Sequence, residues 1–317
     1  MHKIACIFPG QGSQYPGMSR SFADEYSLAR QTFEEADDLL GRKISKIIFD
    51  GPEDVLTQTH NSQTGIFVSS IATLRVLEQQ FPELTPALVA GLSLGEYTAL
   101  CAGGFLSFSE CLQLVDYRGR YMSEACEQTR GTMAVVMGLP ANEVEEMVQD
   151  LCLPEDLWSA NFNCPGQVVI SGTEKGIAAG IYAAKARGAK RVLPLQVHGA
   201  FHSGLMETAR QRLEPHILQA GLQSGSAQIA MNVPGDLVSD IQEIRRNLIQ
   251  QVVCPVRWEQ DIQVMQRAGA SAFISIGCGK SLTNMNKRNG VTVPNLTVEA
   301  VDDLCKIEEF FTCAHTV

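Results

Sequence analysis

The sequence reads Gly91-Leu92-Ser93-Leu94-Gly95-Glu96-Tyr97 between a short apolar run at residues 87–90 and a helix-like run at residues 96–102. A strand, a sharp turn with a serine between glycines, and a helix in that order are the context of a nucleophile elbow. The N-terminus of such a helix presents N–H groups to a developing oxyanion. An ordinary turn with Ser93 as an N-cap is the alternative interpretation. The flanking strand and helix favour a nucleophilic Ser93.

The length and net charge of the chain limit the classes of protein to which it can belong. The chain has 317 residues, of which 45% are hydrophobic, so it can bury a real core as one large domain with an insert or as two lobes. Its net charge of −10 argues against non-specific binding to nucleic acid or to an anionic membrane surface. No apolar run has the length needed to span a bilayer.

Cysteine usage indicates the compartment. The 10 cysteines form no CxxC pair, and the sequence has no secretory n-region and h-region. This pattern favours reduced thiols that act as small core residues, rather than a disulfide framework or a zinc site. We therefore expect a cytoplasmic protein.

The middle of the chain has its own pattern of strands and helices, in the order βαββαβ. The expected elements cover residues 132–137, 141–150, 159–163, 167–171, 176–187 and 191–197. This order is typical of a ferredoxin-like unit. We predict an α/β fold in which residues 1–129 and 197–317 form a large α/β-hydrolase-like domain with a mostly parallel sheet. The ferredoxin-like subdomain is then an insert at residues 130–196.

Two glycine-rich loops resemble nucleotide-binding motifs only in part. The loop after the predicted first strand at residues 4–8 has Tyr15 where a dinucleotide fingerprint needs its third glycine. The loop at residues 277–281 ends in Gly-Lys-Ser, but a P-loop needs glycine where Ile274 stands. His198 and His202 are spaced like metal ligands, but Gly199 weakens a helix there and the HExxH glutamate is missing. We predict neither a cofactor nor a metal.

A base for Ser93 has to come from the 6 histidines. His198 and His202 follow a predicted strand, at the edge of the sheet where the elbow also opens. Arg118, inside a helix predicted at about 109–126, could hold an anion or could cap its own helix. The residues alone leave these alternatives open.

Ordered motifs along residues 1–288 resemble those of malonyl-CoA:acyl carrier protein transacylases. The motifs are residues 8–14, 91–97, 117–119, 161–167, 199–203 and 251–258. The resemblance implies an α/β-hydrolase-like fold with a ferredoxin-like insert. It also implies that malonyl-CoA acylates Ser93 and that His202 is the better base. His202 would take the serine proton and return it to the CoA thiol. The backbone carbonyl of Gln251 would orient His202, since no third acid is obvious.

The resemblance also implies residues that bind the substrate. The backbone N–H groups of Gln11 and Leu94 would form the oxyanion hole. Arg118 would hold the malonyl carboxylate as a bidentate fork. Gln63, which lies just before a helix predicted at 66–79, matches a glutamine of the pocket. Phe201 would leave little room for an α-methyl group, which favours malonyl over methylmalonyl.

Three positions depart from the family pattern. Leu92 stands where the family usually has histidine, and His198 stands where it usually has a small residue. Thr64-Gly65 replaces a proline and a small residue. The serine–histidine pair does not require a histidine at position 92, whereas His198 is a candidate to compete for the site or to crowd it.

The partners implied are malonyl-CoA and an acyl carrier protein, and we expect a monomer. Carrier proteins are acidic, so an acidic enzyme needs a local basic patch for docking. The candidates are Lys185, Arg187, Lys190 and Arg191 on the insert, or Lys280, Lys287 and Arg288. The leading hypothesis is loading of malonyl units for fatty-acid synthesis. The alternatives are a trans-acting malonyltransferase of a polyketide synthase, a serine hydrolase or thioesterase, and an inactive carrier-binding module.

Overall fold

The computed structural model describes residues 3–197 and 199–314. The chain divides into two compact units. The second unit contains Arg120–Ala220 and Met231–Val264, and the first contains the rest of the chain. His198 lies outside the described residues.

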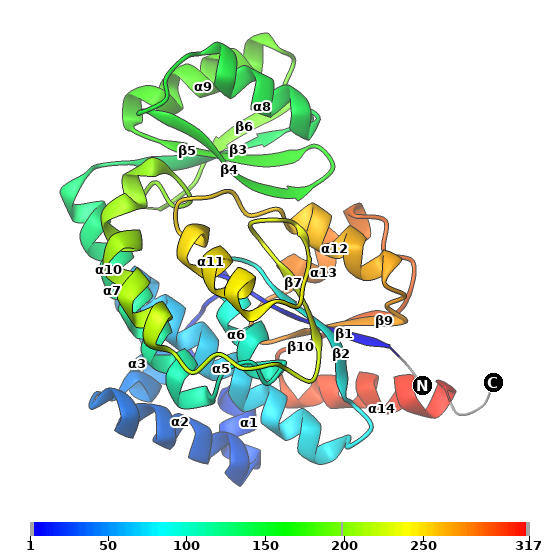
Figure 1. The fold of residues 1–317 in the computed structure, drawn as a ribbon. Helices are drawn as coiled ribbons and strands as arrows, with labels where there is room; N and C mark the ends of the chain where they lie inside the picture. Colours follow the sequence, from blue (N-terminus) through cyan, green and yellow to red (C-terminus); the bar gives the residue numbers. More distant parts are fainter. Residues whose placement is uncertain (1–2, 198, 315–317) are drawn as a thin grey trace. The chain divides into compact units, whose positions relative to one another are not determined.

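A parallel sheet forms the core of the first unit (Figure 1). Five of its six strands are β1 (Ile4–Phe8), β2 (Pro86–Gly91), β7 (Gln228–Met231), β9 (Ala272–Ile276) and β10 (Asn295–Val298). They lie in the order β10-β9-β1-β2-β7, and the neighbouring strands are parallel. Every residue of β1 and β9 is buried, which is why β1 is a continuous apolar run and β9 is apolar apart from Ser275.

Helices accompany this sheet along the chain. They are α1 (Arg20–Glu25), α2 (Ser27–Leu40), α3 (Ile44–Asp50), α4 (Glu53–Thr57), α5 (Thr59–Gln80), α6 (Gly95–Ala102), α13 (Ser281–Arg288) and α14 (Leu304–Ala314), with η2 (Val301–Asp303) before α14. Helix α7 (Phe108–Gln128) runs from the first unit into the second. In the first unit α5 packs against α6 and β9.

The start of α5 corrects an expectation from the sequence. We expected Gln63 to precede a helix at residues 66–79, but α5 begins at Thr59 and Gln63 lies inside it. The hydroxyls of Ser62 and Thr64 donate to the carbonyls of Thr59 and His60 one turn earlier. These hydroxyls therefore find their hydrogen-bond acceptors within their own helix and can be buried. The segment lacks the apolar periodicity that usually predicts a helix.

The second unit contains the predicted βαββαβ order. Its elements are β3 (Thr132–Met137), α8 (Ala141–Asp150), β4 (Leu157–Cys164), β5 (Gln167–Gly172), α9 (Glu174–Ala186) and β6 (Arg191–Pro194). The strands form an antiparallel sheet in the order β4-β5-β3-β6, and Figure 1 shows α8 and α9 on the same face of it. Apolar side chains such as Val136, Met147 and Ile170 fill the space between sheet and helices.

These observations confirm the predicted fold class, a mostly parallel α/β sheet together with a ferredoxin-like antiparallel sheet. The limits of the insert at residues 130 and 196 stay a prediction. Strand β6 ends at Pro194, not at residue 197 as expected.

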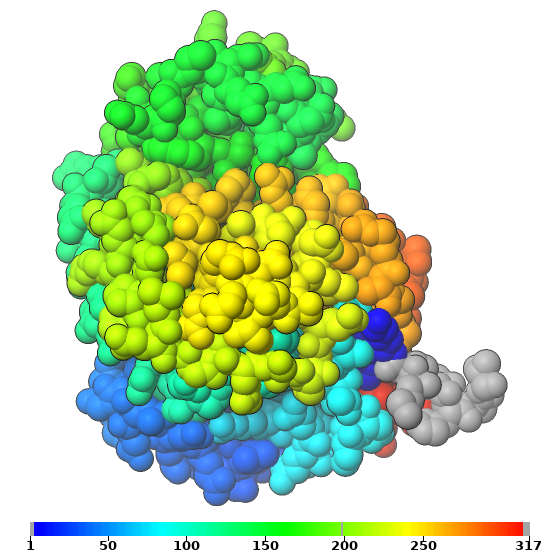
Figure 2. Space-filling view, viewed as in Figure 1, coloured from blue at the N-terminus to red at the C-terminus, as the bar shows by residue number. Residues whose placement is uncertain are grey.

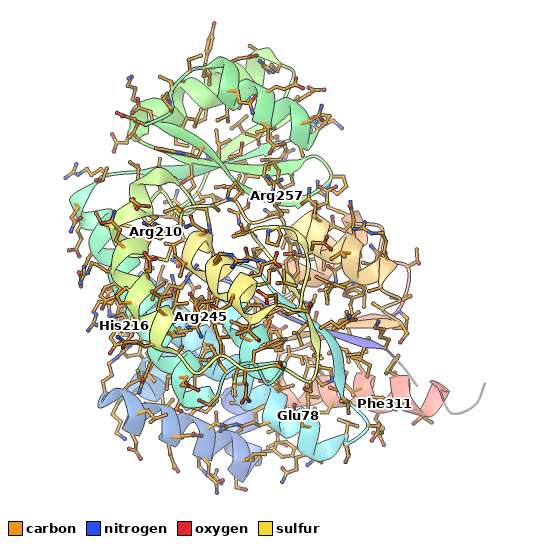
Figure 3. All side chains as sticks on the ribbon, in the orientation of Figure 1. Glu78, Arg210, His216, Arg245, Arg257 and Phe311 are labelled. Carbon is orange, nitrogen blue, oxygen red and sulfur yellow. The ribbon has the colours of Figure 1, made fainter. Side chains whose placement is uncertain are left out.

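The second unit continues with η1 (Gly204–Met206), α10 (Glu207–Gln219), β8 (Asp236–Val238), α11 (Ile241–Gln251) and α12 (Trp258–Arg267). Arg245 of α11 caps the end of α10 by donating to the carbonyls of Leu218 at 2.8 Å and Ala220 at 3.1 Å (Figure 3). His216 of α10 lies 3.0 Å from the hydroxyl of Tyr121. Within the described residues, none of the helices is both long and apolar enough to cross a membrane.

Candidate active site

Ser93 lies in the predicted strand–turn–helix, between the end of β2 at Gly91 and the start of α6 at Gly95. Its φ of 54° is in the left-handed region, which is costly for a residue with a side chain. A Cβ on Gly95 would lie 2.2 Å from the carbonyl oxygen of Phe8, and a Cβ on Gly91 would lie 1.8 Å from the carbonyl carbon of Gly95. Only glycine fits at both positions, so the turn is as tight as the sequence predicts.

The loop after β1 packs against this turn. The N–H of Leu92 donates to the carbonyl of Phe8 at 3.0 Å, and a Cβ on Gly10 would lie 2.3 Å from the carbonyl oxygen of Leu92. Gln11 follows in this loop. Across residues 3–197 and 199–314, the backbone N–H groups of Gln11 and Leu94 have no hydrogen-bond acceptor. Both are therefore available to an oxygen of a substrate.

Arg118 is a buried cation that contacts the serine. Its side chain is 1% exposed, and Nη2 donates to Ser93 Oγ at 3.0 Å. Burial lowers the pKa of the Arg118 guanidinium from its ordinary value, but arginine keeps its charge in proteins. Helix α7 continues to Gln128, so Arg118 is not a cap of that helix. A buried positive charge next to a serine hydroxyl suits a ligand with an anionic group.

Side-chain amides connect Arg118 to the loop after β1. Arg118 Nη1 donates to Gln63 Oε1 at 2.6 Å, and Gln63 Nε2 donates to Gln11 Oε1 at 3.3 Å. Gln11 Nε2 in turn lies 3.4 Å from Thr59 Oγ1. The structure therefore brings together four of the predicted site residues of the first unit. No motif or spacing in the sequence marks Thr59 as part of this group.

His202 of the second unit is held through one ring nitrogen. Its side chain is 3% exposed, and Nδ1 lies 2.9 Å from the carbonyl oxygen of Gln251 and 3.2 Å from that of Cys254. Carbonyl oxygens only accept hydrogen bonds, so Nδ1 carries the proton and the lone pair lies on Nε2. This is the tautomer that a general base requires. The carbonyl contact of Gln251 was predicted, and that of Cys254 was not.

The turn that contains His202 has a strained backbone, and hydrogen bonds of Ser203 stabilise it. His202 has a φ of 57°. The hydroxyl of Ser203, which is fully buried, donates to the carbonyl of Ala200 at 2.5 Å and accepts from the N–H of Leu205 at 3.2 Å. Phe201 is buried in the same turn.

A buried carboxylate lies behind Gln251. The amide Nε2 of Gln251 lies 3.5 Å from Asn232 Oδ1, and Asn232 Nδ2 donates to Asp261 Oδ2 at 2.9 Å. All three side chains are 0% exposed. Nothing in the sequence pattern around Asp261 marks a buried carboxylate, so this interaction could not be predicted.

Residues 5–301 match the model of the family described as acyl transferase domain. The chain belongs to the acyl transferase domain family. The malonyl CoA-acyl carrier protein transacylase of Bacillus subtilis is 39% identical over 289 residues, which are 91% of this chain and 90% of that protein.

Solved structures agree with this membership. An acyl carrier protein S-malonyltransferase from Vibrio cholerae is 35% identical, with a TM-score of 0.91 over 96% of this chain and 99% of that one. A second structure, a type II PKS acyl-carrier protein in complex with its malonyl-transacylase, is 33% identical to this chain. Its TM-score is also 0.91, over 96% of this chain and 98% of that one.

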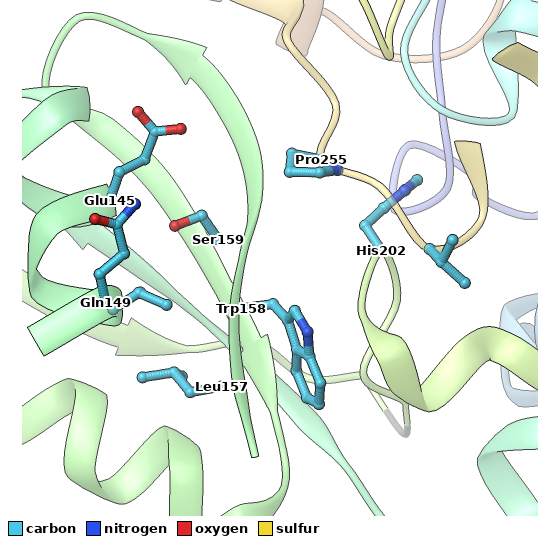
Figure 4. Close-up of a pocket in the computed structure, with 9 residues that line it drawn as sticks. Glu145, Gln149, Leu157, Trp158, Ser159, His202 and Pro255 are labelled. Carbon is cyan, nitrogen blue, oxygen red and sulfur yellow. The ribbon is translucent and has the colours of Figure 1, made fainter. Parts of the chain in front are cut away.

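One small cavity of this acyl transferase domain lies beside His202 (Figure 4). Its volume is about 190 Å³, and its wall includes Trp158, Pro255, Glu145 and Gln149. Ligand pockets usually measure about 300 Å³ or more. We assign no function to this cavity.

The second glycine-rich loop uses its own polar groups. The N–H of Gly279 donates to Glu299 Oε2 at 2.9 Å, and Lys280 Nζ lies 3.5 Å from Glu299 Oε1. Glu299 therefore contacts both the backbone of this loop and its lysine. In the part of the chain that the structure describes, no cluster of three histidine, cysteine, aspartate or glutamate side chains could hold a metal ion.

We expect Asn232→Ala to lower the free energy of unfolding by about 2 kcal/mol, because a buried hydrogen bond to the carboxylate of Asp261 is lost. Urea unfolding followed by circular dichroism measures this change. Asn247→Ala is the control, since the amide of Asn247 is only half-buried and contacts Met231 Sδ at 3.7 Å. The two variants should differ clearly, and equal stabilities would contradict a role for this buried bond.

Proposed function

We propose that the chain transfers the malonyl group from malonyl-CoA to the phosphopantetheine thiol of an acyl carrier protein, and so supplies malonyl units for fatty-acid synthesis. The observation that carries this proposal is the contact of 3.0 Å between buried Arg118 and Ser93 Oγ. Among acyl groups, malonyl has a free carboxylate that a buried guanidinium can bind. Membership of the acyl transferase family supports the same reaction.

The proposed reaction has two halves that share one intermediate. Ser93 Oγ attacks the thioester carbonyl while His202 takes the serine proton through Nε2. The thiol of CoA leaves with that proton, and a malonyl ester of Ser93 remains. The carrier thiol then attacks the ester and passes its proton to His202. The bond from the malonyl carbonyl to Ser93 Oγ breaks, His202 returns the proton to Ser93 Oγ, and the carrier leaves as the malonyl thioester. Gln251 and Cys254 hold Nδ1–H of His202 through their carbonyls, which stabilises the imidazolium during both halves.

The N–H groups of Gln11 and Leu94 would bind the oxyanion of the tetrahedral intermediates. Their lack of a protein acceptor within the described chain supports this role. Such donors act in both halves, because each passes through a tetrahedral intermediate. Acyl exchange between a hydroxyl and a thiol changes no oxidation state, so the proposed reaction needs no redox cofactor.

Arg118 would bind the malonyl carboxylate in a fork in place of its contact with Ser93. Gln63 then has a positioning role, because its Oε1 accepts from Arg118 Nη1 at 2.6 Å and fixes the plane of the guanidinium. Phe201 would restrict the space at the α-carbon of the acyl group. We further propose a monomer that works in the cytoplasm.

The basic patch on the insert is our candidate for docking the acidic carrier protein. Lys185, Lys190 and Arg191 are exposed around α9 and β6, whose surface appears in green shades in Figure 2. No acidic side chain of the described residues pairs with these three, whereas Arg187 pairs with Asp150 at 2.5 Å. Lys280 of the other cluster is paired with Glu299. We therefore favour the insert as the docking surface.

Reversing two charges tests this surface. We expect Lys190→Glu with Arg191→Glu to raise KM for the carrier protein about tenfold, through the loss of attraction to an acidic partner. Acylation by malonyl-CoA should not change. Lys287→Glu with Arg288→Glu is the matched control at the other cluster. An unchanged KM for carrier in the first pair and a raised one in the second would move the docking site to residues 280–288.

Steady-state kinetics with malonyl-CoA and holo carrier protein test the proposed function. We expect parallel lines in double-reciprocal plots, because the malonyl enzyme forms before the carrier binds. If free malonate is released without carrier protein as fast as malonyl is transferred with it, the protein is instead a hydrolase.

The relative in complex with a type II PKS carrier makes a polyketide role the second candidate. Competing carriers of the two pathways in one assay distinguish them.

A further inference from the structure

The hydroxyl of Ser13 forms a hydrogen bond inside the oxyanion loop, which is the loop of residues 9–14 that contains Gln11. Ser13 Oγ donates to the carbonyl oxygen of Gly10 at 2.7 Å. This carbonyl belongs to the peptide group whose N–H is that of Gln11. We propose that Ser13 is a positioning residue that aims the N–H of Gln11 at the oxyanion. The inference rests on the proposed transferase function and extends it to a residue with no contact to the substrate.

The geometry of the peptide bond carries the argument. A peptide group is planar and trans, so its C=O and N–H point in opposite directions. Fixing the oxygen of Gly10 therefore fixes the direction of the Gln11 N–H. A hydrogen bond weakens steeply when its angle departs from linearity, so the direction of a donor in an oxyanion hole matters.

Glycines on both sides make this peptide group easy to rotate. Gly10 and Gly12 flank Gln11, and Gly12 has a φ of 99°. Glycine populates both halves of the φ range, so such a loop has many conformations without further contacts. Ser13 fixes the peptide group before Gln11, and Gln14 fixes the one after it by accepting from the N–H of Gly12 at 2.8 Å.

Cys278 contacts Ser13 from the other side. Cys278 Sγ lies 3.4 Å from Ser13 Oγ, and its side chain is 1% exposed. Burial raises the pKa of Cys278 to about 11, so it stays a neutral thiol near pH 7. The hydroxyl has one proton, and the shorter distance assigns it to the carbonyl of Gly10. The thiol then packs against Ser13 without competing for that proton.

Three variants separate the hydrogen bond from packing. We expect Ser13→Ala to lower kcat for malonyl transfer about tenfold, a part of the hundredfold or more lost when an oxyanion donor is removed. KM for malonyl-CoA and the preference for malonyl over acetyl should stay within about twofold, because Arg118 is untouched. Ser13→Thr keeps the hydroxyl and should recover most of kcat. Cys278→Ala removes the thiol contact alone and should stay close to wild type.

The measurements are single-turnover acylation of Ser93 and steady-state transfer, with thermal unfolding to verify that each variant folds. The inference is overturned if Ser13→Ala acylates as fast as wild type, or if Ser13→Thr is as slow as Ser13→Ala. It is also overturned if KM rises as much as kcat falls. These results differ from failure of the proposed function, in which the wild-type protein itself forms no malonyl ester.

Discussion

His202→Ala is expected to lower kcat for malonyl transfer by about a millionfold, as the loss of the histidine base does in other serine enzymes. Without the imidazole, Ser93 has no group to take its proton, and the leaving thiol has no acid. Rapid-mixing measurement of CoA release checks this result. KM for malonyl-CoA should change little, since the proposed contacts of the malonyl group come from Arg118 and the oxyanion loop.

His216→Ala is the matched control for His202. It removes a histidine of the same unit that contacts Tyr121 rather than backbone carbonyls. We expect its kcat within about twofold of wild type, as for most substitutions away from the reacting groups. A slow His216 variant together with an active His202 variant would contradict the assignment of the base.

Arg118→Ala is expected to lower kcat/KM for malonyl-CoA about a thousandfold, because two charge-assisted hydrogen bonds of about 1.5–3 kcal/mol each are lost. Acetyl-CoA has no carboxylate, so its slow reaction should change only a few-fold. The ratio of the two specificity constants, measured in one assay with both thioesters, therefore collapses. Arg118→Lys should recover part of the ratio, since a lysine supplies the charge without the planar fork.

Arg42→Ala is the control, because it removes a different arginine of the first unit. Arg42 pairs with Asp116 at 2.9 Å and is partly exposed. Its removal should leave the ratio of malonyl to acetyl unchanged. If Arg118→Ala keeps the wild-type ratio, the carboxylate is bound elsewhere and the proposed selectivity is wrong.

The fold could be predicted where one local pattern determines it. Strand β1 is a short apolar run that ends in a glycine-rich loop, and the prediction matched its bounds at residues 4–8. The start of α5 was missed because Ser62 and Thr64 satisfy their hydroxyls within the helix, so a polar segment is buried. The residues before position 66 are polar, so they did not predict a helix.

The candidate site was predictable only in part, for a related reason. The turn of Ser93 has a local signature of glycines, and the remaining roles came from resemblance to a family. The contacts of Ser13 with Cys278, and of Asn232 with Asp261, join residues far apart in the sequence. No spacing rule predicts such contacts, because they depend on how separate segments pack.

The most direct test of the central claim is the intact mass of the protein after brief mixing with malonyl-CoA, with Ser93→Ala alongside. We predict that the wild-type protein gains the mass of one malonyl group and loses it again when holo carrier protein is added. The Ser93→Ala protein should gain nothing. An equal gain in the Ser93→Ala protein, or no gain in the wild type, would contradict a malonyl ester on Ser93.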